Sequence, residues 1–144
     1  MFGREMAGYS ATPLVQKLGI RAGVRVLIIN APNEYEQLVA DLPEGARLSR
    51  RITAPIAFVH LFVRHRAEVE KQLKVLRPKL SDSGTLWVSW PKKSAGIATD
   101  VTEDTIREAA LPLGLVDTKV CAVNDVWSAL KLVIRQRNRK SAQT

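Results

Sequence analysis

The chain has 144 residues, 46% of them hydrophobic, and a formal charge of +8 from 22 Lys and Arg against 14 Asp and Glu. This length suits one domain with its own core, and the hydrophobic fraction excludes a disordered chain. The single cysteine, Cys121, excludes an intrachain disulfide and favours a cytoplasmic location. The basic balance favours anionic partners such as nucleotides or nucleic acid.

The expected organisation is one domain over residues 9–136, between a disordered lead at 1–8 and a basic disordered tail at 137–144. The basic residues at this end of the chain are Arg135, Arg137, Arg139 and Lys140. Such a tail is typically solvated, and contact with nucleic acid is the alternative. No signal sequence or membrane span is expected, because the longest apolar run, 55–63, is too short to cross a bilayer.

The first third of the chain predicts a helix, a strand, a second helix and an edge strand. Pro13 suits the first helical position, with Thr12 as the cap. Residues 24–29 form an aliphatic, β-branched run that is typical of a strand. The next helix is expected over 33–42, where apolar side chains recur at helical spacing. A weak edge strand is expected over 47–52.

Two later strands are apolar on both faces, over residues 56–63 and 85–90. A strand of this kind belongs in the middle of a mostly parallel sheet. The segment between them predicts a helix over 64–80, whose regular part is expected to end at Pro78. A turn at 82–84 should then lead into the second strand. Pro91 cannot donate a backbone hydrogen bond, so strand pairing is expected to stop there.

The last third predicts a helix and two strands. Thr102 caps the helix, and Asp100 and Asp104 are interpreted as helix-start carboxylates rather than as an acid–base pair. The strands at 115–123 and 128–135 are joined by a short turn and should pair as an antiparallel hairpin. The order of elements predicts a single three-layer α/β domain with a mostly parallel sheet and a C-terminal antiparallel strand pair.

Polar and cationic residues gather where the strands are expected to end, and ligands bind beyond the carboxyl ends of strands in open α/β sheets. The candidate ligand-binding residues are Asn30, Pro32, Trp90, Lys92, Lys93, Ser94, Asn124 and Asp125. Lys92 and Lys93 suit a phosphate or carboxylate, and are expected to bind an anion rather than to support the fold. The alternative is that they are ordinary loop lysines. No metal site and no catalytic residue is assigned, because two histidines and one cysteine lack ligand spacing.

Three ring-bearing residues allow a second interpretation. Trp90 and Trp127 could stack against a base or another planar ligand, although tryptophans in strands more often belong to the core. His60 lies in the middle of an apolar strand, and is interpreted as a hydrogen-bonded core residue rather than as a catalyst.

The element order resembles a class I methyltransferase-like Rossmann domain, on three features. These are the helix from Pro13 to Gly19, the run from Ile20 to Leu27 that leads into the first strand, and the segment from Leu80 to Val88. A closer similarity is to a small bacterial family known as domain of unknown function three thousand fifty-two, from Ala7 to about Arg137. Its matching words are Tyr9-Ser10, Thr12-Pro13-Leu14, Lys17-Leu18-Gly19-Ile20, Asn30-Ala31-Pro32, His60-Leu61-Phe62, Leu86-Trp87-Val88-Ser89-Trp90-Pro91-Lys92-Lys93, Thr99-Asp100 and Trp127-Ser128. This similarity implies the fold and no activity.

The chain differs from active methyltransferases at both positions that bind their cofactor. Those enzymes cradle S-adenosylmethionine on a glycine-rich turn after the first strand, but no glycine occurs here between Gly23 and Gly45. They also place an acidic residue at the end of the second strand, where this chain has Ser49, Arg50 and Arg51. No cofactor is therefore expected, and S-adenosylmethionine in particular is not.

These observations favour a non-catalytic binding module with a cationic ligand site at the strand carboxyl ends. Two alternatives remain open. One is a divergent enzyme that acts on a nucleotide-like or other anionic substrate, and the other is a basic protein associated with nucleic acid. Membrane association is not expected, and no oligomeric state is predicted.

Overall fold

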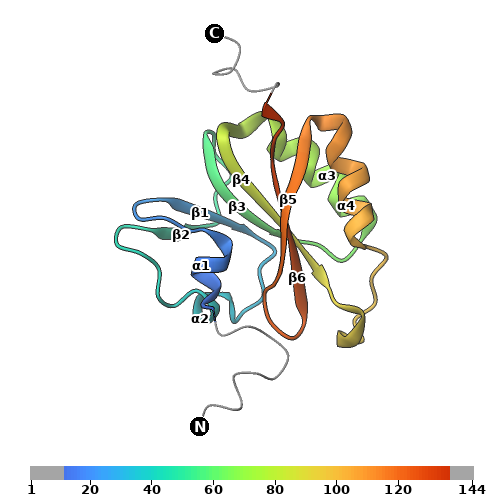
Figure 1. Ribbon diagram of the computed structural model, residues 1–144, viewed down its shortest axis with the longest axis horizontal. Coiled ribbons are helices and arrows are strands. Elements are labelled where there is room, and N and C mark those ends of the chain that lie inside the picture. Colours follow the sequence, from blue (N-terminus) through green and yellow to red (C-terminus); the bar gives the residue numbers. More distant parts are fainter. Residues whose placement is uncertain (1–11, 137–144) are drawn as a thin grey trace.

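The computed structural model describes residues 12–136 and shows a six-stranded sheet with helices against it (Figure 1). The predicted lead at 1–8 and tail at 137–144 lie outside the described residues. The strand order is β2-β1-β3-β4-β6-β5. The strands are β1 (Arg25–Ile29), β2 (Arg47–Ser49), β3 (Ile56–Phe62), β4 (Leu80–Pro91), β5 (Leu115–Ala122) and β6 (Trp127–Ile134). Strands β2, β1, β3 and β4 are parallel, and β6 is antiparallel to both β4 and β5. The predicted fold class is confirmed.

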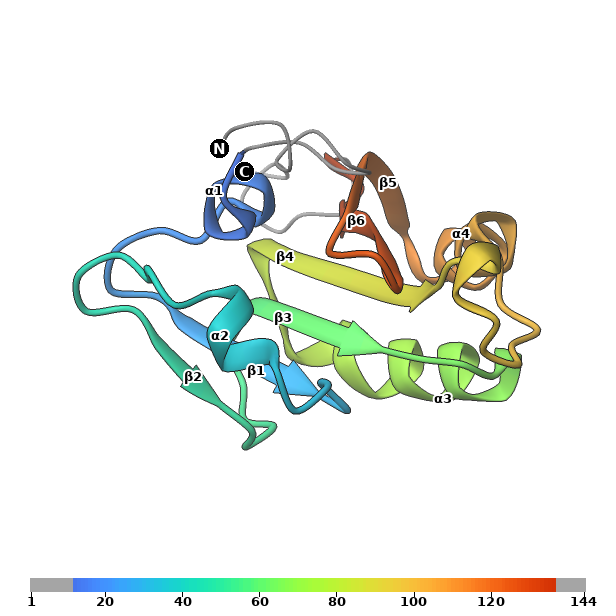
Figure 2. The same cartoon turned by 90° about the horizontal axis from the view of Figure 1, so that it is seen from below.

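Helices cover both faces of the sheet, as predicted (Figure 2). They are α1 (Leu14–Leu18), α2 (Tyr35–Leu38), α3 (Arg66–Leu76) and α4 (Glu103–Ala110), with 3₁₀ turns at Arg77–Lys79, Lys93–Ala95 and Leu111–Leu113. The apolar sides of α3 and α4 pack in one core and those of α1 and α2 in the other. The sheet is therefore the middle of three layers.

The two strands that are apolar on both faces, β3 and β4, lie next to each other near the centre of the sheet. In β4, Leu86 and Val88 pack into the core on the α3 side, whereas Trp87 packs into the core on the α1 side. Each such side chain contributes about 1.5–3 kcal/mol when it is fully buried. Trp87 Nε1 also donates a hydrogen bond of 3.0 Å to the Leu18 carbonyl, which ties α1 to the sheet.

Strand β4 begins at Leu80, which corrects the turn predicted at 82–84. The pairing with β3 is irregular at this point, because Ile56 is opposite Leu80 whereas Phe58 is opposite Thr85. Gly84 lies in this irregular stretch, and a Cβ atom there would come within 2.8 Å of the Ile56 carbonyl oxygen. Gly84 is part of the predicted turn, whereas in the structure it allows the close approach of two strands.

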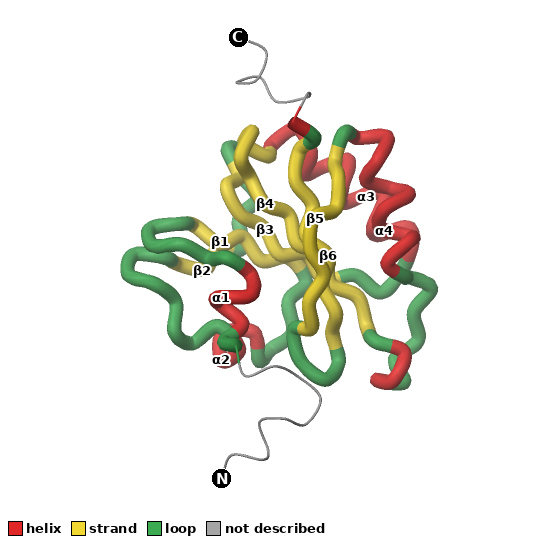
Figure 3. The backbone as a smooth tube through the Cα atoms, in the orientation of Figure 1, coloured by secondary structure: helices red, strands yellow, loops and turns green. Residues whose placement is uncertain are grey.

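Strand β4 ends at Pro91, as expected, although one backbone hydrogen bond to the β5–β6 hairpin follows it. Pro91 is the last residue of β4 and lies opposite Trp127 at the start of β6. The backbone N–H of Lys92 then donates a hydrogen bond of 2.8 Å to the Val126 carbonyl. Proline is tolerated because it lacks only its own donor, while the β5–β6 hairpin extends along the end of β4 (Figure 3).

Several helix ends differ from the prediction. Helix α1 has Pro13 rather than Thr12 as its cap, and α2 is a single short turn that ends at Leu38. Helix α3 ends at Leu76, where the proline of the following 3₁₀ turn stops the regular helix. The strand expected over 47–52 is the shorter edge strand β2.

Thr102 caps α4 as predicted, accepting a hydrogen bond from the Thr105 backbone N–H. Asp104 lies in the first turn of the same helix, also as predicted. Asp100 acts at a different helix: its Oδ1 accepts a hydrogen bond of 2.8 Å from the backbone N–H of Arg66, the first residue of α3. Asp100 is therefore a helix-start carboxylate, as predicted, but it lies at the start of α3 and not of α4, for which it was predicted.

Candidate functional site

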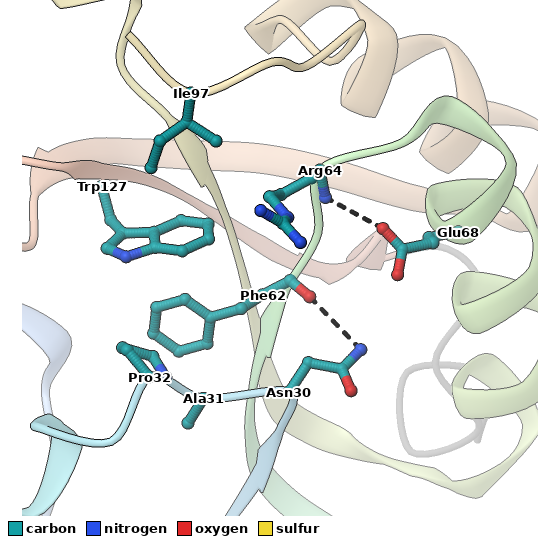
Figure 4. Close-up of a pocket in the computed structure, with 8 residues that line it drawn as sticks. All are labelled: Asn30, Ala31, Pro32, Phe62, Arg64, Glu68, Ile97 and Trp127. Carbon is teal, nitrogen blue, oxygen red and sulfur yellow. Dashed lines mark hydrogen bonds between the residues drawn. The ribbon is translucent and has the colours of Figure 1, made fainter. Parts of the chain in front are cut away.

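A cavity of about 410 Å³ opens at the carboxyl ends of β1 and β3 (Figure 4). It is lined by Asn30, Ala31, Pro32, Phe62, Arg64, Glu68, Ile97 and Trp127. These residues come from the turns after β1 and β3, the first turn of α3, the loop after β4 and the start of β6. The position agrees with the general location of ligands in open α/β sheets.

The turn after β1 begins at Asn30, whose φ of 59° is in the left-handed region. Asparagine tolerates this conformation better than most residues other than glycine. The Asn30 side-chain Nδ2 lies 3.5 Å from the Phe62 carbonyl oxygen and donates to it across the gap between β1 and β3. The backbone thus turns away from the sheet at Asn30 without a glycine, and Ala31 and Pro32 follow along the cavity.

Phe62 and Trp127 form an aromatic wall. Their ring centroids are 5.0 Å apart with an interplanar angle of 87°, an edge-to-face contact. Behind the wall, the Phe62 ring is stacked on His60 at 4.4 Å and meets Tyr35 edge-on at 5.6 Å. Phe62 is almost completely buried, whereas Trp127 is only half-buried. The wall is therefore held from the core, and its outer member faces the opening.

Arg64 supplies the cation of the cavity. Its backbone is held on both sides, because its N–H donates to Glu68 Oε1 at 2.9 Å and its carbonyl accepts from Thr99 Oγ1 at 2.7 Å. Its guanidinium makes no hydrogen bond or ion pair with any residue in the described range, 12–136, and is directed into the cavity on the side of Trp127 (Figure 4). A fixed backbone with an unpaired guanidinium is suited to hold an anion.

Glu68 is the only carboxylate among the lining residues. Its Oε1 accepts hydrogen bonds from the backbone N–H groups of Arg64 and His65, at 2.9 and 3.0 Å. Those N–H groups precede α3, where a negative charge is favoured by the helix dipole. The carboxylate is therefore engaged in capping the helix.

His60 lies behind the aromatic wall and is completely buried. Its Nδ1 is 2.8 Å from the Tyr35 hydroxyl and its Nε2 is 2.7 Å from the Ser89 hydroxyl. A neutral imidazole has one donor and one acceptor, and two hydroxyl groups can satisfy both. Burial lowers the pKa of His60 from 6.5 to about 3, so the ring is neutral in the folded protein. The prediction of a hydrogen-bonded core histidine is confirmed.

Of the residues predicted from the sequence, Asn30 and Pro32 line the cavity. Trp90 is 9% exposed and packs in the core with α3 and α4. Trp127, against which a planar ligand could stack, lines the cavity as part of the aromatic wall. Trp90 is therefore a core residue, whereas Trp127 lies at the cavity.

The other predicted residues lie elsewhere. Lys92 is half-buried and Lys93 and Ser94 are exposed, and none of the three is among the lining residues. Asn124 Oδ1 accepts hydrogen bonds of 2.9 Å from two backbone N–H groups in the β5–β6 turn. Asp125 is exposed in the same turn. The structure gives Asn124 a role in the hairpin.

Phe62, Arg64, Glu68 and Ile97 were not predicted. A usable signal existed for Arg64, since it lies just beyond the carboxyl end of the strand expected at 56–63 and the same rule that selected Lys92 applies to it. No local signal marks Ile97, because the loop after β4 is held beside the turn after β3 by tertiary hydrogen bonds, from Thr99 Oγ1 to the Arg64 carbonyl and from the Arg66 N–H to Asp100.

Within residues 12–136, no group of three or more His, Cys, Asp and Glu side chains is placed to hold a metal ion. None of the helices described is long and apolar enough to cross a bilayer.

The chain differs from methyltransferases at the two positions that hold S-adenosylmethionine in those enzymes. The turn after β1 has the left-handed Asn30 but no glycine that would let the backbone approach a ligand closely. Beyond the end of β2, the Arg25 guanidinium donates to the Arg51 carbonyl at 3.0 Å, next to Ser49. Where methyltransferases have an acidic residue at the end of the second strand, this chain has Ser49, Arg50 and Arg51, so neither position has the residue type that holds S-adenosylmethionine in those enzymes.

Solved structures with a similar fold include methyltransferases. A ribosomal protein L11 methylase from Lactobacillus delbrueckii subsp. bulgaricus matches with a TM-score of 0.52 and 8% identity, over 85% of this chain and 75% of its own. A putative type 11 methyltransferase from Sulfolobus solfataricus matches with 0.57 and 11%, over 85% and 89%. A magnesium protoporphyrin IX methyltransferase from Synechocystis PCC 6803, solved with bound SAM, matches with 0.55 and 11%, over 84% and 74%.

At such low identity these likenesses show the fold alone, a Rossmann-like methyltransferase fold. No curated protein matches the chain. One family model does match, over residues 58–136, which include most of β3, all of β4 to β6 and the cavity residues Phe62, Arg64 and Trp127. The chain belongs to the family described as Protein of unknown function (DUF3052).

Proposed function

We propose that this protein is a non-catalytic binding module that holds a small anionic ligand in the cavity at the carboxyl ends of β1 and β3. One observation carries the proposal: the guanidinium of Arg64, unpaired among the described residues, is directed into a cavity walled by Phe62 and Trp127. Ligand sites are commonly apolar cavities of this size with a few well-placed polar groups.

The polar groups near the cavity support binding rather than acid–base catalysis. A general base must be able to reach a ligand atom and must be free to take up a proton. Glu68 Oε1 is already held by two backbone N–H groups, and His60 is buried behind Phe62 with both ring nitrogens hydrogen-bonded. Arg64 and Asn30 recognise anions and polar groups but do not exchange protons near neutral pH.

We further propose that S-adenosylmethionine is not the ligand, although the fold is that of methyltransferases. The absence of glycine after β1 and the basic residues Arg50 and Arg51 directly after β2 both argue against it. Isothermal titration calorimetry should detect no binding in the micromolar range. Micromolar affinity for S-adenosylmethionine would contradict this part of the proposal.

A cavity-filling variant tests the location of the site. A thermal-shift screen of small metabolites on the parent protein should find compounds that raise the unfolding temperature. Ala31→Leu places extra methyl groups in the cavity and should abolish those shifts. Ala57→Leu is the matched control, because Ala57 is exposed in β3 and is not a lining residue, so this variant should keep them. Equal shifts in all three proteins would place the site elsewhere.

Nucleic acid and a cytoplasmic location remain predictions. The net charge of +8 supports the first, and the single cysteine supports the second. The basic residues Arg137, Arg139 and Lys140 lie outside the described residues. Binding to RNA should be measured over a salt series. Affinity for nucleic acid should fall steeply with salt, because it depends on many phosphate contacts, and this distinguishes it from binding of a small anion in the cavity.

A further inference from the structure

The shape and charge of the cavity restrict the ligand further. We infer that it is a flat aromatic molecule that carries one anionic group, a carboxylate or a phosphate. The inference rests on the proposed function, since it concerns the same cavity. It follows from the separation of the lining residues into an aromatic side and a polar side (Figure 4).

The aromatic side is suited to a flat ring. Phe62 is edge-on to Trp127, which leaves the half-buried indole as the largest apolar surface that a ligand can meet. Pro32 and Ile97 add aliphatic contacts to the same cavity. Rings that contact tryptophan gain from offset stacking as well as from burial. Because Phe62 is held from behind by His60, the wall is already in place before a ligand binds.

The polar side is suited to an anion. The Arg64 guanidinium has five N–H donors in a planar fork, which matches the two oxygens of a carboxylate or phosphate. Asn30 lies across the cavity from Trp127 and has an amide group with two donors, one of which reaches the Phe62 carbonyl at 3.5 Å. A ring that contacts Trp127 can therefore direct a substituent toward Arg64.

Glu68 limits the negative charge that the site accepts. Its carboxylate lies on the same side as Arg64, and its hydrogen bonds to the N–H groups that precede α3 offset its charge only in part. A like charge nearby weakens the binding of an anion. The cavity should therefore prefer a ligand with a single anionic group to one with several.

Four compounds of similar size test the inference by calorimetry or ligand-detected NMR. They are 1-naphthoate, 1-naphthyl phosphate, 1-naphthamide and cyclohexanecarboxylate. One or both aromatic anions should bind roughly ten- to a hundredfold more tightly than the neutral amide, as expected for hydrogen bonds to a charged group. Cyclohexanecarboxylate should bind more weakly than 1-naphthoate, because it lacks the flat ring. Comparison of the two aromatic anions shows whether the site prefers a carboxylate or a phosphate.

Three variants assign the effect to residues. Arg64→Gln should remove the advantage of the aromatic anion over 1-naphthamide, with the affinity for the amide unchanged. Arg50→Gln is the matched control, because Arg50 is also exposed just beyond the carboxyl end of a strand but does not line the cavity. Glu68→Gln keeps an oxygen acceptor for the helix cap and removes the charge, so it should strengthen anion binding severalfold. Each variant should first be shown to unfold at the parent temperature.

The outcomes separate the inference from the proposed function. If neither 1-naphthoate nor 1-naphthyl phosphate binds more tightly than 1-naphthamide, or if Arg64→Gln and Arg50→Gln lose equal affinity, the inference is overturned. If the screen finds only aliphatic or neutral ligands, and Ala31→Leu abolishes their binding, the ligand class is wrong while the cavity is still the site. If Ala31→Leu changes no binding at all, the proposed function fails and the inference fails with it.

Discussion

His60 Nε2 lies 2.7 Å from Ser89 Oγ, and neither side chain is exposed to solvent. The bond connects the two central strands, and the Tyr35 hydroxyl on the other side of the imidazole connects the pair to α2. Because the same imidazole ring is stacked on Phe62, this buried chain supports the wall of the cavity as well as the core. A polar chain of this kind specifies one arrangement only while every member is satisfied.

Replacing Ser89 with alanine should be destabilising. The change leaves His60 Nε2 buried without a partner, which typically costs about 1–3 kcal/mol of unfolding free energy. Urea unfolding followed by circular dichroism measures it. Ser94→Ala is the control, because Ser94 is exposed and has no hydrogen-bond partner of its side chain in the described residues, so its change should stay within about 0.5 kcal/mol. If the two variants unfold alike, the Ser89–His60 bond does not contribute to stability.

The stability of the protein should fall as the pH is lowered from about 6.5 toward 3. Burial holds the pKa of His60 at about 3 in the folded state, against 6.5 for the exposed group. In this window the unfolded chain therefore binds one more proton than the folded chain, and stability rises with pH by up to about 1.4 kcal/mol per pH unit. Above pH 6.5 neither state is protonated at His60, so its contribution is constant.

The pH dependence is measured by urea unfolding at a series of pH values. His65→Asn removes the other histidine and retains a residue that is favoured as a helix cap, so it should lose stability over the same window as the parent. A parent protein whose unfolding free energy is unchanged between pH 6.5 and 4.5 would show that His60 is not held neutral. If the unfolding free energy of His65→Asn no longer depends on pH in this window, the effect comes from His65 and not from His60.

Gly84→Ala should destabilise the protein through steric overlap rather than backbone strain. The new Cβ would lie 2.8 Å from the Ile56 carbonyl oxygen and 2.9 Å from that of Ser81, and neither backbone atom can move alone. Overpacking of this kind costs about 1–3 kcal/mol. Thermal unfolding compares it with Ser83→Ala, a neighbouring exposed position where the change should be negligible. Equal midpoints for the two variants would show that the strands can separate at Gly84.

The double variant Lys92→Ala, Lys93→Ala separates the two candidate cations. Among the described residues neither side chain has a hydrogen-bond or salt-bridge partner, so the unfolding free energy should change by no more than about 0.5 kcal/mol. Because neither residue lines the cavity, the affinity for 1-naphthoate should fall less than in Arg64→Gln. If the double variant loses more affinity for 1-naphthoate than Arg64→Gln does, the anion binds at the lysines, as the sequence predicts.

The sequence by itself determined the features that depend on local spacing. The runs at 56–63 and 85–90, which are apolar on both faces, predicted two central strands, and Thr102 with its first-turn carboxylates predicted the start of α4. The short connection after 115–123 predicted the antiparallel hairpin. These features were predictable because burial on two faces, capping and short turns each depend on residues that are close together in the chain.

Only the tertiary structure decided which distant residues meet. The insertion of β6 between β4 and β5 added one backbone hydrogen bond beyond Pro91, and the loop after β4 placed Asp100 at the start of α3 rather than of α4. The same folding brought Trp127 to Phe62 and left Arg64 in the cavity while Lys92 lies outside its lining. These contacts join segments that are tens of residues apart, and their geometry depends on strand order and packing, which local periodicity does not encode.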